Sequence, residues 1–336
     1  MPRFAELQKN KTLNHPSLPQ DETVPPTPTA AEDFTFVVTA DTQFGMTNNN
    51  VSWEEEIQYS RAAVRQINAL EPRPLFCCVC GDLVHMVAEI YTKKKGMSAP
   101  MTRQACDEIQ DRQNKDFKEV WSEIHDDIPL VCVCGNHDVG NRPTPISITR
   151  FRQVYGDDHL AFWAQRAYNI VVNTSLFSDP SGAPEFFQEQ FDWMTERLQY
   201  AKRHQASHIF VFGHHPWFLY DEDEDKDTLP GRSPLEDLGM EGSIEDYYFV
   251  IPLDIRKKVL ALFEEYGVTA CFAGHFHQNM VSHTKSGMPM ITTSSLSVIL
   301  KSTGIPETFQ EPKTRGMRIV TAARDGSFEH KFVSLC

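Results

Sequence analysis

The chain has 336 residues, of which 40% are hydrophobic and 23% are charged, and its formal net charge at pH 7 is −14. This composition is typical of a globular protein with a large buried core, and it excludes a chain that is disordered throughout. Binding to nucleic acid or to anionic lipid usually depends on a basic face. The acidic balance therefore argues against both of these partners.

The sequence lacks the features of a secreted or membrane protein. No charged start is followed by an apolar segment at the N-terminus, and no run of about eighteen apolar residues occurs. We therefore expect a cytoplasmic protein. Several cysteines sit inside apolar runs, which indicates reduced core residues and not a disulfide framework. They are Cys77, Cys78, Cys80, Cys132 and Cys134.

Residues 1–32 are polar and interrupted by proline, a composition that cannot offset its ordering entropy by burial. We predict a flexible, proline-rich tail there. From Phe34 onward, short apolar runs alternate with helix-like segments, which is the pattern of repeated β-α units and a largely parallel sheet. The folded part of the chain is therefore expected to begin at residue 33.

Five short apolar runs, each ending abruptly, are predicted as buried strands at 34–40, 75–80, 130–134, 208–212 and 269–273. Helices are predicted at 52–70, 103–124, 188–205 and 254–266, the first with Ser52 as its N-cap. A further strand is predicted at 168–173. Beyond residue 277 we expect short strands near 288–293, 318–323 and 328–334, with a hairpin turn at 324–326. The acidic run at 221–227 predicts a long, mobile loop with a solvated face.

A polar cluster follows each of the five buried runs. In chain order the clusters are Asp41-Thr42-Gln43, Gly81-Asp82, Gly135-Asn136-His137-Asp138, Gly213-His214-His215 and Gly274-His275-Phe276-His277. Ligands of open α/β sheets bind at the carboxyl ends of the strands, so groups far apart in the sequence can converge on one crevice there.

Aspartate, asparagine and histidine are ligands of divalent metals. Imidazole suits zinc or iron, and carboxylate or amide oxygen suits manganese or magnesium. Residues i and i+2 of an extended segment face the same way, so Asp41 with Gln43, and His275 with His277, can each present two groups together. A lone histidine is more often a hydrogen-bonded or surface residue. The five clusters together, however, predict a site for two divalent ions.

This ordered set resembles the calcineurin-like metallophosphoesterases. Within that superfamily, the segments TADTQFG, CGDLVH, CGNHDVGN, RKKVLALFEEYGV and AGHFHQN are similar to the calcineurin-like phosphoesterase domain-containing protein 1 group, a family of serine/threonine protein phosphatases. The resemblance implies a metallophosphoesterase domain over residues 33–336. Its fold would be α/β, a four-layer sandwich in which two mixed β-sheets are flanked by helices.

The resemblance also implies a role for each site residue. The implied metal ligands form two sets that share Asp82, namely Asp41, Gln43, Asp82 and His277 for one ion, and Asp82, Asn136, His214 and His275 for the other. His137 would lie beside the ions without ligating them. A hydroxide shared by the ions would attack phosphorus, and His137 would act as the general acid for the leaving group. The implied substrate is phosphoserine or phosphothreonine in a protein.

Two positions depart from the commoner pattern of the superfamily. Gln43 stands where most members have histidine, and an amide oxygen is a weaker donor than imidazole, so the metal stays open among manganese, iron, zinc and magnesium. His85 stands where the better-known serine/threonine phosphatases have an aspartate that orients the catalytic histidine, and the phosphate-binding arginine that follows it is also absent. The candidates for these missing roles are His85, Asp138 and Arg142.

These residues are also compatible with other roles and other functions. His215 could contact substrate or support its neighbour His214. The same metal core also serves phosphodiesterases and phosphatases that act on a small molecule such as a nucleotide. Some members of the superfamily have lost ligands and serve as non-catalytic, protein-binding scaffolds. A nuclease is disfavoured, because no basic stripe occurs.

Overall fold

A computed structural model describes residues 33–92, 101–229, 231–236, 242–306, 309 and 311–335. The tail predicted at 1–32 lies outside these residues. Within the described ranges, no helix combines the length and the apolar character needed to cross a bilayer.

The first of two large sheets is mixed and has the strand order β13-β12-β1-β2-β3. Its strands are β1 (Phe34–Thr39), β2 (Cys77–Cys80), β3 (Leu130–Val133), β12 (Gly316–Ala322) and β13 (Phe328–Ser334). β1, β2 and β3 run parallel, whereas β12 is antiparallel to both β1 and β13. The predicted hairpin turn joins β12 to β13, where Gly326 has a φ of 92° and Ala323 N–H donates to Ser327 O.

The second sheet is also mixed and has the order β10-β11-β9-β6-β5-β4. Its strands are β4 (Leu160–Ala164), β5 (Ala167–Val171), β6 (His208–Phe212), β9 (Ala270–Ala273), β10 (Met280–His283) and β11 (Pro289–Thr292). The four inner strands are parallel, and β4 and β10 close the two edges in antiparallel pairing. A separate pair joins β7 (Arg232–Pro234) to β8 (Ser243–Glu245).

The strands of the first sheet are apolar on both faces because both faces are covered. Phe36 and Val38 of β1 point into the core between the sheets, while Val37 between them points to the outer core beneath the helices. The ring of Phe36 lies 5.3 Å from that of Phe210 in β6 and 5.6 Å from that of Phe272 in β9. These contacts pack the two sheets face to face.

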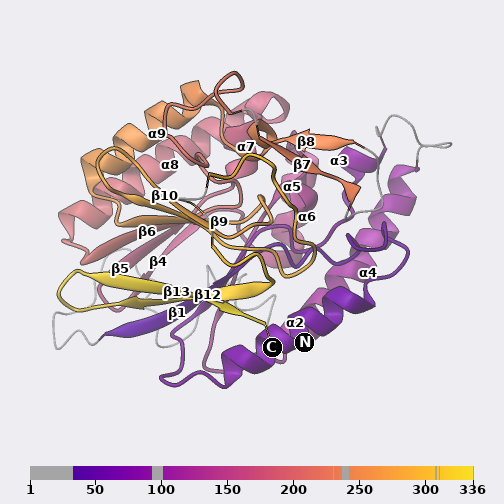
Figure 1. Ribbon diagram of the computed structural model, residues 1–336, viewed down its shortest axis with the longest axis horizontal. Coiled ribbons are helices and arrows are strands. Elements are labelled where there is room, and N and C mark those ends of the chain that lie inside the picture. The colour runs from indigo at the N-terminus through magenta and orange to yellow at the C-terminus, as the bar shows by residue number, and fades with distance from the viewer. Residues whose placement is uncertain are drawn as a thin grey trace.

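Helices cover the outer face of each sheet (Figure 1). α2 (Glu54–Asn68) and α4 (Arg103–Trp121) cover the first sheet, and α8 (Pro184–Arg203) and α9 (Leu253–Tyr266) cover the second. The result is a four-layer α/β sandwich, which confirms the expected fold class. α2 begins at Glu54 with Trp53 as its N-cap, so the prediction of Ser52 as N-cap is wrong; the Ser52 hydroxyl instead accepts a hydrogen bond from Asn48.

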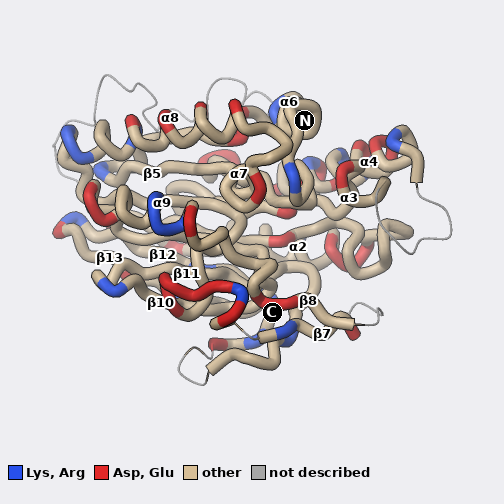
Figure 2. The backbone as a smooth tube through the Cα atoms, turned by 90° about the horizontal axis from the view of Figure 1, so that it is seen from above, with Lys and Arg blue, Asp and Glu red and all other residues tan. Residues whose placement is uncertain are grey.

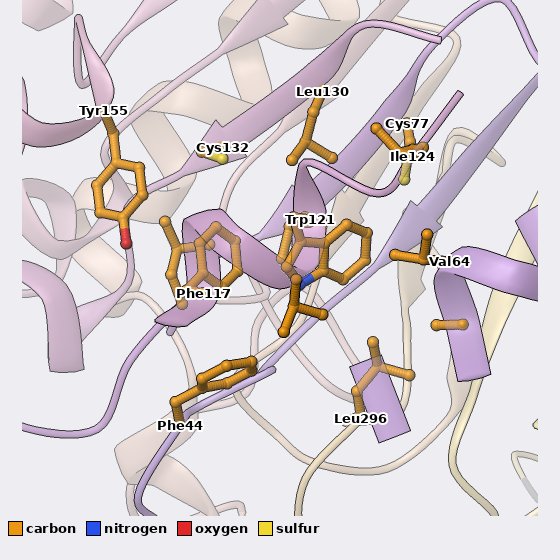
Figure 3. Packing of buried hydrophobic residues seen from close by; sticks show 14 of the residues in the cluster. Phe44, Val64, Cys77, Phe117, Trp121, Ile124, Leu130, Cys132, Tyr155 and Leu296 are labelled. Carbon is orange, nitrogen blue, oxygen red and sulfur yellow. The ribbon is translucent and has the colours of Figure 1, made fainter. Parts of the chain in front are cut away.

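The outer core of the first sheet contains two of the cysteines expected to be reduced. Phe117 and Trp121 of α4 pack beside Cys77 of β2 and Cys132 of β3 (Figure 3). Every described cysteine is buried. Burial raises the pKa of the Cys77 thiol well above its ordinary value, so this side chain acts as a small apolar group.

Besides the strands β4, β7, β8 and β10, several helical elements were not predicted, and they lie mainly in the loops that follow the strands. They are α3 (Ala88–Tyr91), α5 (Asn136–Val139), α6 (Pro145–Tyr155), α7 (Thr174–Ser178), η1 (Pro180–Gly182) and η3 (Asp246–Phe249).

The acidic run at 221–227 has a defined path and is held at several points, in contrast to the mobile loop expected from its composition. The carboxylate of Glu224 accepts hydrogen bonds from the backbone N–H groups of Leu219, Tyr220 and Asp221. Arg256 of α9 donates to backbone carbonyls on both sides of the run. Asp223 pairs with Lys257 and Lys285 beside α9 and β10, where the run forms a red stretch in Figure 2.

Candidate metal centre

The polar clusters after β1, β2, β3, β6 and β9 meet at one place. Two groups of side chains there could each hold a metal ion, and both include Asp82: one is Asp82, His214 and His275, and the other is Asp41, Asp82 and His277. All of these residues are buried. The sheets therefore bring together residues that lie as much as 236 positions apart in the chain, from Asp41 to His277.

The first group surrounds the Nε2 atom of His214. This atom lies 3.3 Å from Asp82 Oδ1, 3.1 Å from Asn136 Oδ1 and 3.1 Å from His275 Nδ1. In the second group, His277 Nε2 lies 3.4 Å from Asp41 Oδ1. Gln43 lies beside this group, and its Nε2 donates a hydrogen bond to Asp82 Oδ2 at 3.3 Å. The structure thus places each of the predicted metal ligands in one buried cluster.

The backbone at these residues is strained. Asp41, Gln43, Asp82, His275 and His277 have φ values of 52°, 41°, 50°, 65° and 55°, in the left-handed region that residues with a Cβ rarely adopt. Such strain collects at functional sites and persists only where the surroundings enforce it. Here the loops after β1 and β2 are joined by backbone hydrogen bonds, from Asp41 N–H to Gly81 O at 3.0 Å and from Gln43 N–H to Asp82 O at 2.8 Å.

Two glycines allow the close approach of the loops. A Cβ on Gly135 would lie 2.1 Å from Asp82 Oδ1, and a Cβ on Gly274 would lie 2.6 Å from Asp41 Oδ2. Both distances are far shorter than a van der Waals contact. Glycine is therefore required at these positions for the carboxylates to keep their places.

Hydrogen bonds to backbone carbonyls set the tautomers of two histidines. His214 Nδ1 donates to Cys80 O at 2.8 Å, and His277 Nδ1 donates to Val298 O at 2.7 Å. In each neutral imidazole the Nε2 lone pair then points toward a carboxylate. A hydrogen bond from the other ring nitrogen to a backbone carbonyl is the usual way in which metal-ligating histidines are oriented in proteins.

The donor set fits divalent cations. Oxygen and nitrogen atoms lie close together there, and Gln43 Oε1 is buried without a hydrogen-bond partner in the described part of the chain. Burial raises the pKa of Asp41 well above its ordinary value. Burial alone would lower the pKa of His214, but Asp82 and Asp41 outweigh it and raise that pKa to about 10. The cluster therefore favours positive charge, which metal ions would supply in place of a proton.

His137 lies at the edge of the cluster and is oriented by a backbone group. Its N–H donates to Asp82 Oδ1 at 2.8 Å, and its Nδ1 donates to the carbonyl oxygen of His85 at 2.8 Å. The two imidazole rings stack with centroids 4.5 Å apart, and His85 Nε2 lies 2.5 Å from the hydroxyl of Tyr91. The carbonyl and ring of His85 thus occupy the place expected for an orienting carboxylate.

Asp138 directs its carboxylate to backbone groups. It accepts hydrogen bonds from the N–H groups of Leu83, Val84 and Gly135. Burial and the charge of Asp82 raise the pKa of Asp138 to about 8. Asp138 therefore braces the loops after β2 and β3.

Arg142 and His215 also have defined contacts. Arg142 is exposed and donates to Ser181 O at 3.2 Å. His215 Nδ1 lies 3.1 Å from Thr174 Oγ1, and its ring lies 4.2 Å from that of His275. His215 therefore lies behind a candidate ligand and supports it.

Two further residues lie next to the cluster and were not among the predicted site residues. The amide of Asn136 contacts Asn141 at 2.7 Å and the hydroxyl of Tyr248 at 3.1 Å. Asn141 lies in the same CGNHDVGN segment as Asn136, so the sequence could have indicated that it lies near the site. Tyr248 lies 112 positions from Asn136, and nothing local in the sequence marks it as a neighbour of the site.

A two-sheet α/β sandwich with Asp and His groups that could hold metals at its strand ends is the architecture of a metallophosphoesterase. Residues 34–279 match the family model described as calcineurin-like phosphoesterase. The match covers well over half of the chain, and the chain therefore belongs to the calcineurin-like phosphoesterase family.

Curated relatives resemble the chain over most of its length. It is 32% identical over 311 residues to the serine/threonine-protein phosphatase CPPED1 of Danio rerio, covering 90% of this chain and 85% of the relative. It is 31% identical to CPPED1 of Homo sapiens, covering 90% and 84%. The resemblance found in the sequence is thereby confirmed.

Solved structures share the fold at low identity. A dimetal phosphatase from Danio rerio superposes with a TM-score of 0.52 at 15% identity, covering 90% of this chain and 99% of that one. A purple acid phosphatase from yellow lupin superposes with a TM-score of 0.57 at 13% identity, covering 91% and 52%.

Proposed function

We propose that this chain is a metal-dependent protein phosphatase that hydrolyses phosphoserine and phosphothreonine. The observation that carries the proposal is the position of His137, whose backbone N–H bonds the same Asp82 that both metal-holding groups share. The similarity to the CPPED1 phosphatases supports the choice of phosphoproteins as substrates.

The residues of the site would have two roles, metal binding and proton donation. A bound pair of divalent ions, manganese, iron, zinc or magnesium, would polarise the phosphoryl group and supply an ionised water as nucleophile. Asp41, Gln43, Asp82 and His277 would hold one ion, and Asp82, Asn136, His214 and His275 the other. The hydrogen bond from His137 Nδ1 to His85 O leaves Nε2 as the atom that gives a proton to the departing alkoxide.

We propose that the substrate is a phosphorylated protein and that this chain is located in the cytoplasm. The burial of the described cysteines in the core agrees with a reducing compartment.

The general-acid role of His137 is tested by comparing leaving groups. p-Nitrophenolate is a stable anion and needs little protonation, whereas a serine alkoxide is strongly basic. We expect His137→Ala to lower kcat/KM about 10²- to 10⁴-fold for a phosphoserine peptide and far less for p-nitrophenyl phosphate. The exposed His283 on β10 provides the control, and His283→Ala should leave both rates unchanged. Equal losses on the two substrates would contradict the assignment.

The substrate class is tested with the wild-type protein. We expect hydrolysis of phosphoserine and phosphothreonine peptides to exceed that of a nucleoside monophosphate and of bis-p-nitrophenyl phosphate. A preference for either small molecule would favour a nucleotide phosphatase or a phosphodiesterase. No hydrolysis of any of them by the metal-loaded protein would favour a scaffold.

A further inference from the structure

A closed triangle of hydrogen bonds lies behind Asn136. Its Nδ2 donates to Asn141 Oδ1 at 2.7 Å and to the Tyr248 hydroxyl at 3.1 Å. The Tyr248 hydroxyl donates to Asn141 Oδ1 at 3.0 Å, which closes the triangle. Asn136 begins α5, Asn141 follows that helix, and Tyr248 comes from η3, so the triangle joins two segments distant in the sequence.

Donors and acceptors balance within the triangle. The two amide hydrogens of Asn136 and the hydroxyl hydrogen of Tyr248 make three donors, and each makes one bond. Asn141 Oδ1 accepts two of these bonds, one with each lone pair, and the phenol oxygen accepts the third. The orientation of the Asn136 amide is therefore fixed by its neighbours.

This orientation decides what Asn136 presents to the metal centre. With the nitrogen held by the triangle, Oδ1 lies 3.1 Å from His214 Nε2, among the atoms of the first group. A flipped amide would set its oxygen against Asn141 Oδ1, an acceptor facing an acceptor, and would present an NH₂ group to the metal position. An NH₂ group has no lone pair to offer a cation.

The same segment, η3, supports a second candidate ligand. The ring of Tyr248 lies 5.2 Å from that of His275, and the ring of Phe249 lies 5.1 Å from it. η3 is itself anchored through the buried Asp246, which accepts hydrogen bonds from Ser302 at 2.5 Å and from Ser233 at 3.3 Å. Tyr248 is nevertheless 39% exposed, so its ring can be changed without opening the core.

We propose that Tyr248 and Asn141 are positioning residues, which hold the amide oxygen of Asn136 toward the metal position that it shares with Asp82, His214 and His275. The inference rests on the proposed metal pair and does not depend on which phosphate ester is hydrolysed.

Tyr248→Phe tests the proposal, because it removes one hydroxyl and keeps the ring against His275. Isothermal titration of the metal-free full chain with Mn²⁺ measures both sites separately. We expect one site to lose affinity about 10- to 100-fold, as is usual when a residue that orients a metal ligand is changed, and the other site to stay within about twofold. Tyr247→Phe is the matched control, since Tyr247 belongs to η3 but packs with a separate apolar cluster, and it should bind both ions normally.

Asn141 gives an independent test by rescue. Asn141→Asp keeps an acceptor for both bonds, whereas Asn141→Leu keeps none. We expect the aspartate variant to retain most of the Mn²⁺ affinity and the leucine variant to lose it at the same site as Tyr248→Phe. Thermal unfolding of the metal-free proteins shows whether each variant is folded, and Tyr248→Phe should melt within a few degrees of the wild type.

Unchanged affinity at both sites in Tyr248→Phe and Asn141→Leu would overturn the proposal, as would equal weakening of both sites or a wild type that binds no second ion. A different set of results would contradict the proposed function and leave the role of Tyr248 and Asn141 intact. The wild type would then bind two Mn²⁺ ions, the variants would weaken one site as described, and no phosphopeptide would be hydrolysed.

Discussion

Asp82 is the residue that joins the two halves of the centre. Its carboxylate lies 3.3 Å from His214 Nε2 and 3.3 Å from Gln43 Nε2, and it also accepts the N–H of His137. Burial would raise the pKa of Asp82, but His214 and His137 outweigh it and hold that pKa well below the ordinary value. The side chain is thus an anion at neutral pH, as a ligand shared by two cations must be.

Gly135 keeps the space that this carboxylate needs. In Gly135→Ala the new methyl group would lie 2.1 Å from Asp82 Oδ1, so the carboxylate has to move. We expect bound metal to fall below two ions per chain, and kcat/KM to fall by about 10³-fold because the ions contribute several kcal/mol to the transition state.

Metal analysis after gel filtration and a phosphopeptide assay check this prediction. Gly287→Ala is the control, because a Cβ on Gly287 meets nothing within 4 Å. It replaces a glycine with a φ of 94°, so it should cost some stability while leaving metal content and activity intact. Full metal content and full activity in Gly135→Ala would show that the close approach has no bearing on the site.

At the scale of elements, the five buried strands were predictable, whereas β4, β7, β8 and β10 and the short connecting elements were not. The five buried runs were recognised because each is apolar and ends at a glycine or a polar residue, and the structure places strands in all of them. η3 and α5 are only four residues long, too short for a periodic pattern. Ser52 was misassigned because a local capping signal cannot show that Asn48 already uses the serine hydroxyl.

The same limit applies to contacts made by backbone atoms. His85 O orients His137, and Cys80 O and Val298 O orient His214 and His277. A carbonyl is present in every residue, so residue type carries no signal for these roles. The candidate ligands could be named from the sequence because metal ligation depends on the type of side chain.

The link between α6 and α7 provides a test of stability against pH. Asp158 is fully buried, and its carboxylate accepts hydrogen bonds from Arg152 of α6 at 2.7 Å and from Asn173, before α7, at 2.9 Å. Burial opposes ionisation, but His159, Arg152 and Asn173 together lower the pKa of Asp158 from 3.8 to about 2. This difference corresponds to about 2 kcal/mol of folding free energy.

The stabilisation is present above the unfolded pKa, near 4, and is lost as the pH falls toward 2. We therefore expect Asp158→Asn to lower the free energy of unfolding by about 2 kcal/mol at pH 7, and the gap to the wild type to close between pH 4 and pH 2. Urea unfolding of both proteins at several pH values measures this difference in the free energy of unfolding. Asp192→Asn, an exposed change on α8, is the control, and a gap that stays constant with pH would refute the assignment.

At the scale of the whole molecule, the charge of −14 should influence the choice of substrate. Asp and Glu residues are spread over many elements of the backbone in Figure 2. With a negative net charge, the protein should attract basic peptides from a distance and repel acidic ones. We expect kcat/KM for a phosphopeptide flanked by lysines to fall as NaCl is raised from about 20 to 300 mM, because salt screens such interactions.

A phosphopeptide of the same length flanked by glutamates is the matched control, and its kcat/KM should rise over the same range of salt. Parallel responses of the two peptides would mean that the net charge does not steer substrate to this site.

The four layers were expected only from the resemblance to the family, whereas the cluster of candidate ligands was expected from the polar residues that follow the predicted strands. The sequence could not predict how the loops complete the site. Tyr248 and Asn136 meet only because the second sheet carries η3 across to the end of β3, and that meeting depends on the packing of the two sheets.

The most direct test of the two-metal centre is an anomalous difference map from a crystal of the full chain soaked in Mn²⁺. The account predicts two peaks about 3.5 to 4 Å apart, with the carboxylate of Asp82 between them. Asn136 and His275 should contact one peak, and Asp41 and His277 the other. A single peak, or peaks that do not touch Asp82, would contradict it.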